Sequence, residues 1–211
     1  MLRSRVSLNL FVGVLCALSL LAPGVSRSAN LPGVHVQKRF EYYEVPGATY
    51  AELKAALDAR KARGVDWTGR TATSIVWSVP VNGRGDCRLT DASVNLTLTV
   101  ILPRLPAGVR LSAGEAERWR RAENTLADHE DGHVQIATDG AQRILRTIQA
   151  SRCTDWKGAA EGEATALQAR QKAYDLRTDH GRQNTTETVD QAAPANNLNG
   201  YPVQWSVQDA E

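Results

Sequence analysis

The feature that most constrains this chain is a long amphipathic segment that begins near Ser112 and reaches about Ala150. Ser112 and Glu115 have the S-x-x-E spacing of a capping box, in which two side chains satisfy backbone N–H groups at the start of a helix. Apolar residues then recur at the three- and four-residue spacing of one helical face: Trp119, Ala122, Leu126, Ile136, Ala137, Ile144, Leu145 and Ile148. We therefore predict one long helix that buries this face in a domain.

Two histidines lie on the same face, in the sequence HEDGH formed by residues 129–133. Residues four apart stack on one side of a helix, so the imidazoles of His129 and His133 can reach the same tetrahedral metal ion. H-E-x-x-H on a helix is the zinc-binding pattern of metalloproteases, in which the glutamate, here Glu130, is the general base. Two core histidines without a metal would each need another hydrogen-bond partner, so the pattern favours a zinc site.

A catalytic zinc site usually has three protein ligands and one water, so a third ligand is expected elsewhere in the chain. His180 is the first choice, because it lies at the expected end of the last helix, and the carbonyl end of a helix favours a nearby cation. Asp175 in the same segment, AYDLRTDHG, is the second choice. Glu163 is the third, since it would give a His-His-Glu site. An ordinary surface side chain is the alternative interpretation of each.

The first 29 residues have the composition of a secretory signal peptide. Arg3 and Arg5 precede an apolar run over residues 8–22, and small residues follow. This run is shorter than the roughly 20 apolar residues that cross a membrane. We therefore expect cleavage and export to the periplasm or the cell exterior, without a stable membrane anchor. Cys87 and Cys153 remain after cleavage, and two cysteines in an oxidising compartment are expected to form a disulfide.

The charge balance excludes two classes of partner. The signal region contains three of the 25 basic residues and none of the 23 acidic residues, so the expected mature chain is close to neutral. It also has no polybasic cluster. Nucleic acid and anionic membrane surfaces are therefore not expected as partners, and a peptide or protein substrate is the partner that a zinc site implies. The sequence does not indicate an oligomeric state.

Other segments predict the elements that surround the long helix. Residues 40–45 are rich in β-formers and end before a Pro-Gly turn, which predicts a strand. Thr49 and Glu52 then form another capping box, which predicts a helix that ends near Gly64. A further helix over residues 159–177 follows from an alanine-rich, strongly helix-forming sequence.

Two alternating segments, residues 75–79 and 94–102, predict strands with one buried face each. The turn sequence NGRGDC between them predicts antiparallel pairing. Residues 94–102 could present an edge to an extended substrate or could be a plain core strand. The expected fold is α+β, with a small, mostly antiparallel sheet packed on the long helix and a C-terminal helix. Its expected organisation is a signal peptide at 1–29, one domain at 30–182 and a polar tail at 183–211.

A combination of short motifs carries a resemblance to a known family. The motifs are YYEVPG, the W-x-V of residues 77–79, LPR at 102–104, HEDGH, and YDLRTDHG late in the chain. Together they resemble a bacterial family of secreted zinc-dependent proteases that is described mainly as a domain of unknown function. The resemblance extends over about residues 40–181. It implies a zincin-like fold in which His129 and His133 bind zinc, Glu130 is the general base and His180 completes the site.

The expected function is therefore that of an exported zinc-dependent metallopeptidase. Zinc would activate a water and polarise the scissile carbonyl, while Glu130 transfers the proton. Tyr174 is a candidate donor to the oxyanion, although packing on the helix is the favoured interpretation of this residue. Two other classes stay open: a noncatalytic zinc-binding protein of the cell envelope, and a zinc hydrolase that acts on a non-protein amide, such as one in the cell wall.

Overall fold

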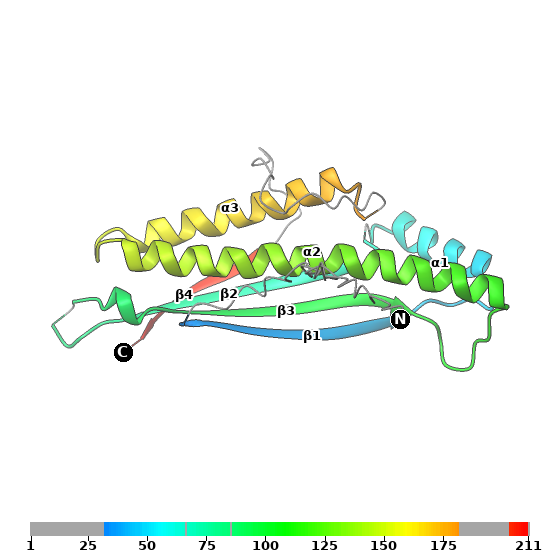
Figure 1. Ribbon diagram of the computed structural model, residues 1–211, viewed down its shortest axis with the longest axis horizontal. Helices are drawn as coiled ribbons and strands as arrows, with labels where there is room; N and C mark the ends of the chain where they lie inside the picture. Colours follow the sequence, from blue (N-terminus) through cyan, green and yellow to red (C-terminus); the bar gives the residue numbers. More distant parts are fainter. Residues whose placement is uncertain (1–31, 66, 85, 182–202, 211) are drawn as a thin grey trace, which may run out of the picture.

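The computed structural model describes residues 32–65, 67–84, 86–181 and 203–210, and the expected signal peptide lies outside them. In chain order these residues form β1 (Val34–Glu44), α1 (Tyr50–Ala62), β2 (Arg70–Pro80), a 3-10 turn (Leu89–Asp91), β3 (Ser93–Arg104), α2 (Ala113–Ala150), α3 (Trp156–Arg177) and β4 (Val203–Ala210). Figure 1 shows α2 running along the sheet, with α3 beside one half of it and α1 near its other end.

The sheet is mixed, with the strand order β1-β3-β2-β4. The predicted antiparallel pair is confirmed, because β2 and β3 pair antiparallel across the connection that contains NGRGDC. The expectation of a mostly antiparallel sheet is wrong, since β1 pairs parallel to β3 and β4 pairs parallel to β2. The reason is that β3 returns from β2 and inserts between β2 and β1, which places the first strand alongside the third.

The strand order also decides which backbone can meet a ligand. β3 is paired on both sides, so it is a core strand and has no edge to present to a substrate. β4 pairs with β2 from Thr73 onward. Residues 70–72 of β2 therefore have a strand partner only on the β3 side, within the part of the chain that the structure describes. β4 itself lies in the segment expected to be a polar tail.

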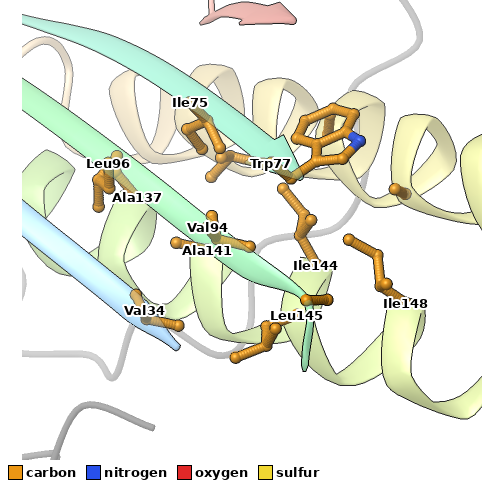
Figure 2. Close-up of a cluster of buried hydrophobic side chains, with 14 of the residues drawn as sticks. Val34, Ile75, Trp77, Val94, Leu96, Ala137, Ala141, Ile144, Leu145 and Ile148 are labelled. Atoms are coloured by element: carbon orange, nitrogen blue, oxygen red, sulfur yellow. The ribbon is translucent and has the colours of Figure 1, made fainter. Parts of the chain in front are cut away.

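The long helix is confirmed, from Ala113 to Ala150. At its start, the Glu115 carboxylate accepts a hydrogen bond from the backbone N–H of Ser112 at 3.2 Å. The second half of its predicted apolar face lies in the core and meets side chains from β1, β2 and β3 (Figure 2): Ala137, Ala141, Ile144, Leu145 and Ile148 against Val34, Ile75, Trp77, Val94 and Leu96. In the first half, Trp119 is buried in a second cluster, Leu126 is half-buried and Ala122 is exposed. No described helix is long and apolar enough to span a membrane.

The predicted disulfide is confirmed between Cys87 and Cys153. Cys87 lies in the connection between β2 and β3, and Cys153 lies between α2 and α3. The bond therefore joins the sheet to the start of α3. A closed loop of about 66 residues is worth roughly 4 kcal/mol of unfolding free energy in the chain-entropy description.

Replacing both cysteines by serine should lower the free energy of unfolding by up to about 4 kcal/mol, because the unfolded chain regains the entropy of the open loop. Urea unfolding followed by circular dichroism measures this difference. As a control, a reducing agent should shift the midpoint of the wild type and leave that of the double variant unchanged. Equal midpoints for the oxidised wild type and the double variant would contradict the stabilising role.

Candidate metal centre

Three potential ligand atoms meet between α2 and the end of α3. His129 and His133 extend from α2, and Asp175 extends from α3. Asp175 Oδ1 lies 3.0 Å from the Nε2 atom of each histidine, and the two Nε2 atoms lie 3.2 Å apart. All three side chains are buried. They are a group that could hold a metal ion.

The separations between these atoms fit a tetrahedral ion. Zinc binds nitrogen and oxygen ligands at about 2.0–2.2 Å, so neighbouring ligands of a tetrahedral site lie about 3.3 Å apart. The observed 3.0, 3.0 and 3.2 Å are close to this value. Three ligands also leave a fourth position for water or substrate, as in a catalytic zinc site. The residues therefore fit the group that HEDGH predicts.

The other ring nitrogen of each histidine has a fixed partner. Thr178 Oγ1 donates to the Tyr174 carbonyl at 2.8 Å, so toward His129 Nδ1, 3.3 Å away, it acts as an acceptor. The side-chain oxygen of Gln171 accepts from His133 Nδ1, while its amide donates to the His133 carbonyl at 3.1 Å. Both Nδ1 atoms thus carry the proton, which leaves both Nε2 lone pairs free for a metal.

The charge of Asp175 also favours binding of a cation by this group. When no metal is bound, burial disfavours the charged form of Asp175, but protonated His129 and His133 donate to it from Nε2 and outweigh this effect, which holds the pKa of Asp175 well below the usual range. Burial likewise lowers the pKa of His133, yet the hydrogen bond and charge of Asp175 raise it overall. The carboxylate is therefore ionised and attracts positive charge at the point where the three ligand atoms meet.

Glu130 follows His129 on α2. It lines a cavity together with His129, His133 and Asp175. Its Oε2 atom accepts a hydrogen bond from Thr71 Oγ1 at 2.7 Å, which ties α2 to the first residues of β2. Burial raises the pKa of this carboxyl, although His133 and Thr71 act in the opposite direction. Glu130 is thus a buried, oriented carboxyl with one oxygen held by Thr71, next to the ligand set but outside it.

Two glycines let α3 approach α2 closely. A methyl group at Gly132 would overlap the ring and hydroxyl of Tyr174, and one at Gly140 would lie 2.8 Å from the Leu167 side chain. The Tyr174 ring stacks on His129 with a centroid distance of 5.0 Å and meets His133 edge-on at the same distance. Tyr174 does not line the cavity. Its position agrees with a packing role and gives no support to an oxyanion donor.

The structure orders the three candidates for the third ligand differently from the sequence. Asp175, the second choice, is in the ligand group. His180, the first choice, is on the exposed side of it, with 63% of its side chain accessible and Nδ1 3.8 Å from Asp175 Oδ1. Asp179 and His180 both have left-handed φ values, 47° and 52°, so the chain turns sharply after α3 and places Gly181, rather than His180, against His129. Glu163 lies apart from the group and approaches Arg170 at 3.9 Å.

Sequence reasoning did not find Gln171, Thr178 or Thr71. A signal for the first two was present, because α3 buries one face with helical spacing: Trp156, Ala160, Ala164, Leu167, Gln171, Tyr174, Asp175 and Thr178. Polar residues that continue an apolar stripe need partners inside the protein. Thr71 carried no such signal, since its contact with Glu130 depends on how the sheet meets α2.

The three candidate ligands, His129, His133 and Asp175, line a cavity of about 1310 Å³. Its wall includes α2 from Arg118 to His133, the C-terminal part of α1, the first residues of β2 and the turn that follows α3. A cavity of this size, with the metal group and Glu130 at one end, has room for a molecule much larger than a water.

Residues 40–181 match the family described as "Bacterial protein of unknown function (DUF922)". The chain belongs to this bacterial family. The DUF922 match has the same extent as the motifs that run from YYEVPG to YDLRTDHG, so these motifs lie within the family's shared region. No curated protein and no solved structure matches the chain. Membership in DUF922 does not name an activity, which must therefore be argued from the site.

Asp175→Ala should reduce zinc affinity by about 100-fold or more, since even residues that only orient a ligand cost 10–100-fold. His180→Ala should change the affinity less than about tenfold, because His180 lies outside the ligand group. Competition with a chelating dye measures both constants. A larger loss for His180→Ala would instead support the ligand set His129, His133 and His180.

Gly132→Ala should destabilise the protein by about 1–3 kcal/mol and weaken zinc binding, because the added methyl group must displace Tyr174 from the histidines. Gly162→Ala on α3 is the matched control, since nothing lies within 4 Å of its new methyl group. The control should be neutral or stabilising by up to about 1 kcal/mol. Thermal unfolding with and without zinc measures both variants, and equal behaviour would contradict the role of Gly132.

Proposed function

We propose that this protein is an exported zinc-dependent metallopeptidase. The observation that carries the proposal is the meeting of His129 Nε2, His133 Nε2 and Asp175 Oδ1 beside the buried carboxyl of Glu130. A metal-storage or structural site requires only the three ligands. A hydrolase also requires a base near the metal, and Glu130 follows His129 in the sequence and lines the same cavity as the three ligand residues.

His129, His133 and Asp175 would hold the zinc ion. Zinc in such a site lowers the pKa of a coordinated water and polarises a carbonyl group. Glu130 would accept a proton from the attacking water and deliver it to the leaving amine. Thr71 keeps one oxygen of Glu130 in place, so the carboxyl can turn its other oxygen to the cavity without losing its position.

The cavity and the sheet support an extended polypeptide as substrate. Residues 70–72 of β2 line the cavity in part, next to Glu130, and their outer edge lies beyond the end of β4. An extended chain can pair with such an edge through its backbone groups. Residues 94–102 of β3, paired on both sides, cannot offer this edge, so the proposal assigns it to β2. The disulfide is consistent with export to an oxidising compartment.

Two alternative functions differ from this proposal in their need for Glu130 or in their substrate. A noncatalytic zinc-binding protein of the cell envelope would use the same three ligands but would not need Glu130. A zinc hydrolase acting on a non-protein amide would need the whole set. Two histidines and one carboxylate also suit Fe(II), so the metal that the protein carries on isolation is part of the test.

The decisive experiment compares the wild type with Glu130→Gln. The amide keeps the size of the side chain but cannot accept the proton, so hydrolysis of a mixed peptide library should fall by about 10²–10⁴-fold while one zinc per chain is retained. Metal content is measured by mass spectrometry and cleavage by the appearance of new peptide termini. Glu163→Gln, on α3 and outside the cavity, is the control and should keep both properties.

Three outcomes would contradict the proposal. Iron in place of zinc in the gently purified protein would argue against a zinc hydrolase. Full activity of Glu130→Gln would remove the proposed base. Cleavage of cell-wall peptides with non-protein amide bonds, together with no cleavage of any ordinary peptide, would favour the second alternative.

A further inference from the structure

The cavity continues far beyond the metal ligands, along the N-terminal half of α2. Arg118 and Arg121 line it, and they precede His129 by eleven and eight residues. At 1.5 Å per residue, these positions lie about 16 and 12 Å from His129 along the helix axis. We define this part of the cavity, between α1 and the first half of α2, as the outer cavity.

Positive charge gathers around the outer cavity. Lys61 from α1, Arg70 from the start of β2, and Arg118 and Arg121 from α2 all line it. Among the residues that the structure describes, Lys61 and Arg70 form no salt bridge, and Arg118 instead lies over the Tyr50 ring at 5.4 Å. Arg121 pairs with the exposed Glu117 at 3.0 Å. Three separate elements therefore supply cations to the outer cavity, and two of these cations, Lys61 and Arg70, have no ion-pair partner among the described residues.

Most carboxylates that line the cavity lie near the candidate metal centre and not among these cations. Glu130 and Asp175 belong to the metal centre, and Asp179 lies in the turn beside it. In the outer cavity the described lining residues include one carboxylate, Glu123, and burial raises the pKa of this group. The metal end thus attracts a cation, whereas the outer cavity attracts an anion.

Aromatic residues accompany the cations. Tyr50, Trp67 and Trp119 line the outer cavity, together with the apolar Leu57 and Val65. Such surfaces bind the apolar parts of an extended chain, while the cations bind its charged side chains. Among the described residues, 70–72 of β2 pair only with β3, so their other edge can pair with a peptide backbone, which a polysaccharide does not have.

We infer that the outer cavity binds acidic side chains of an extended peptide substrate, about four or five residues from the bond that is cleaved. This inference rests on the proposed function for the position of the cleaved bond. The spacing follows from geometry, because an extended chain advances about 3.3 Å per residue and the two arginines lie about 12 and 16 Å from the metal end. Attraction across such distances is weakened by salt, with a screening length of about 8–10 Å at physiological ionic strength.

Binding can be measured without hydrolysis in the full-length chain with Glu130→Gln, loaded with zinc. Three ten-residue peptides carry the same neutral dye and differ only at three positions, which are all Glu, all Gln or all Lys. Fluorescence anisotropy gives their dissociation constants in low and in high salt. We expect the Glu peptide to bind at least tenfold more tightly than the Gln peptide in low salt, with the difference shrinking as salt is added, and the Lys peptide to bind most weakly.

Charge-reversal variants locate the binding site. Lys61→Glu and Arg118→Glu affect exposed side chains, so both variants should fold, as circular dichroism would verify. Each should reduce the preference for the Glu peptide at least threefold, and the double variant should abolish it. Arg146→Glu is the matched control, because Arg146 is also exposed on α2 but lies outside the cavity. It should leave the preference unchanged.

The outcomes separate this inference from the proposed function. If the wild type cleaves peptides but the Glu and Gln peptides bind equally, the acidic preference is wrong and the peptidase proposal stands. If the Glu peptide binds more tightly but no peptide is cleaved, the peptidase proposal falls and the acidic-peptide site stands. An equal loss in Arg146→Glu, or tight binding of polygalacturonate without any preference among the peptides, would overturn the inference.

Discussion

The close packing of α3 on α2 is the constraint on which the rest of the structure depends. Gly132 and Gly140 have no side chains, so Tyr174 and Leu167 can lie directly against the backbone of α2. This approach brings the buried face of α3 to the histidines and places Asp175 3.0 Å from both. The H-E-x-x-H spacing alone provides two potential metal ligands on one helix, and the short distance between the helices provides the third.

The contact between α2 and α3 would destabilise the folded protein if its buried polar groups had no hydrogen-bond partners. Burying a carboxylate and two imidazoles away from water disfavours the fold unless each finds a partner. Asp175 lies between the two histidines, and Gln171 and Thr178 accept from their outer nitrogens. The carboxylate, the amide and the hydroxyl all come from one face of α3. The site is therefore assembled by two helices, and the sheet contributes Thr71 to orient Glu130.

Local periodicity was enough to predict much of this arrangement. The capped helix with its apolar stripe, the antiparallel β2–β3 pair, the disulfide and the inward direction of His129 and His133 all follow from spacing or composition. The parallel pairing of β1 and the order of the strands depend on long-range contacts, which leave no local pattern. His180 was preferred over Asp175 for its place at the carbonyl end of the last helix, whereas the deciding factor is that α3 still faces inward at Asp175 and the turn after α3 leaves the His180 side chain exposed.

The positions of the disulfide and of Asp175 at opposite ends of α3 have a thermodynamic consequence. From Trp156 to Asp175 the helix extends about 28 Å, and a sliding motion of one residue, about 1.5 Å, would separate the carboxylate from the imidazoles. The covalent bond at the start of α3 opposes such sliding. Metal affinity and the redox potential of Cys87–Cys153 are then linked quantities: any free energy that the disulfide adds to metal binding, a bound metal adds to the stability of the disulfide.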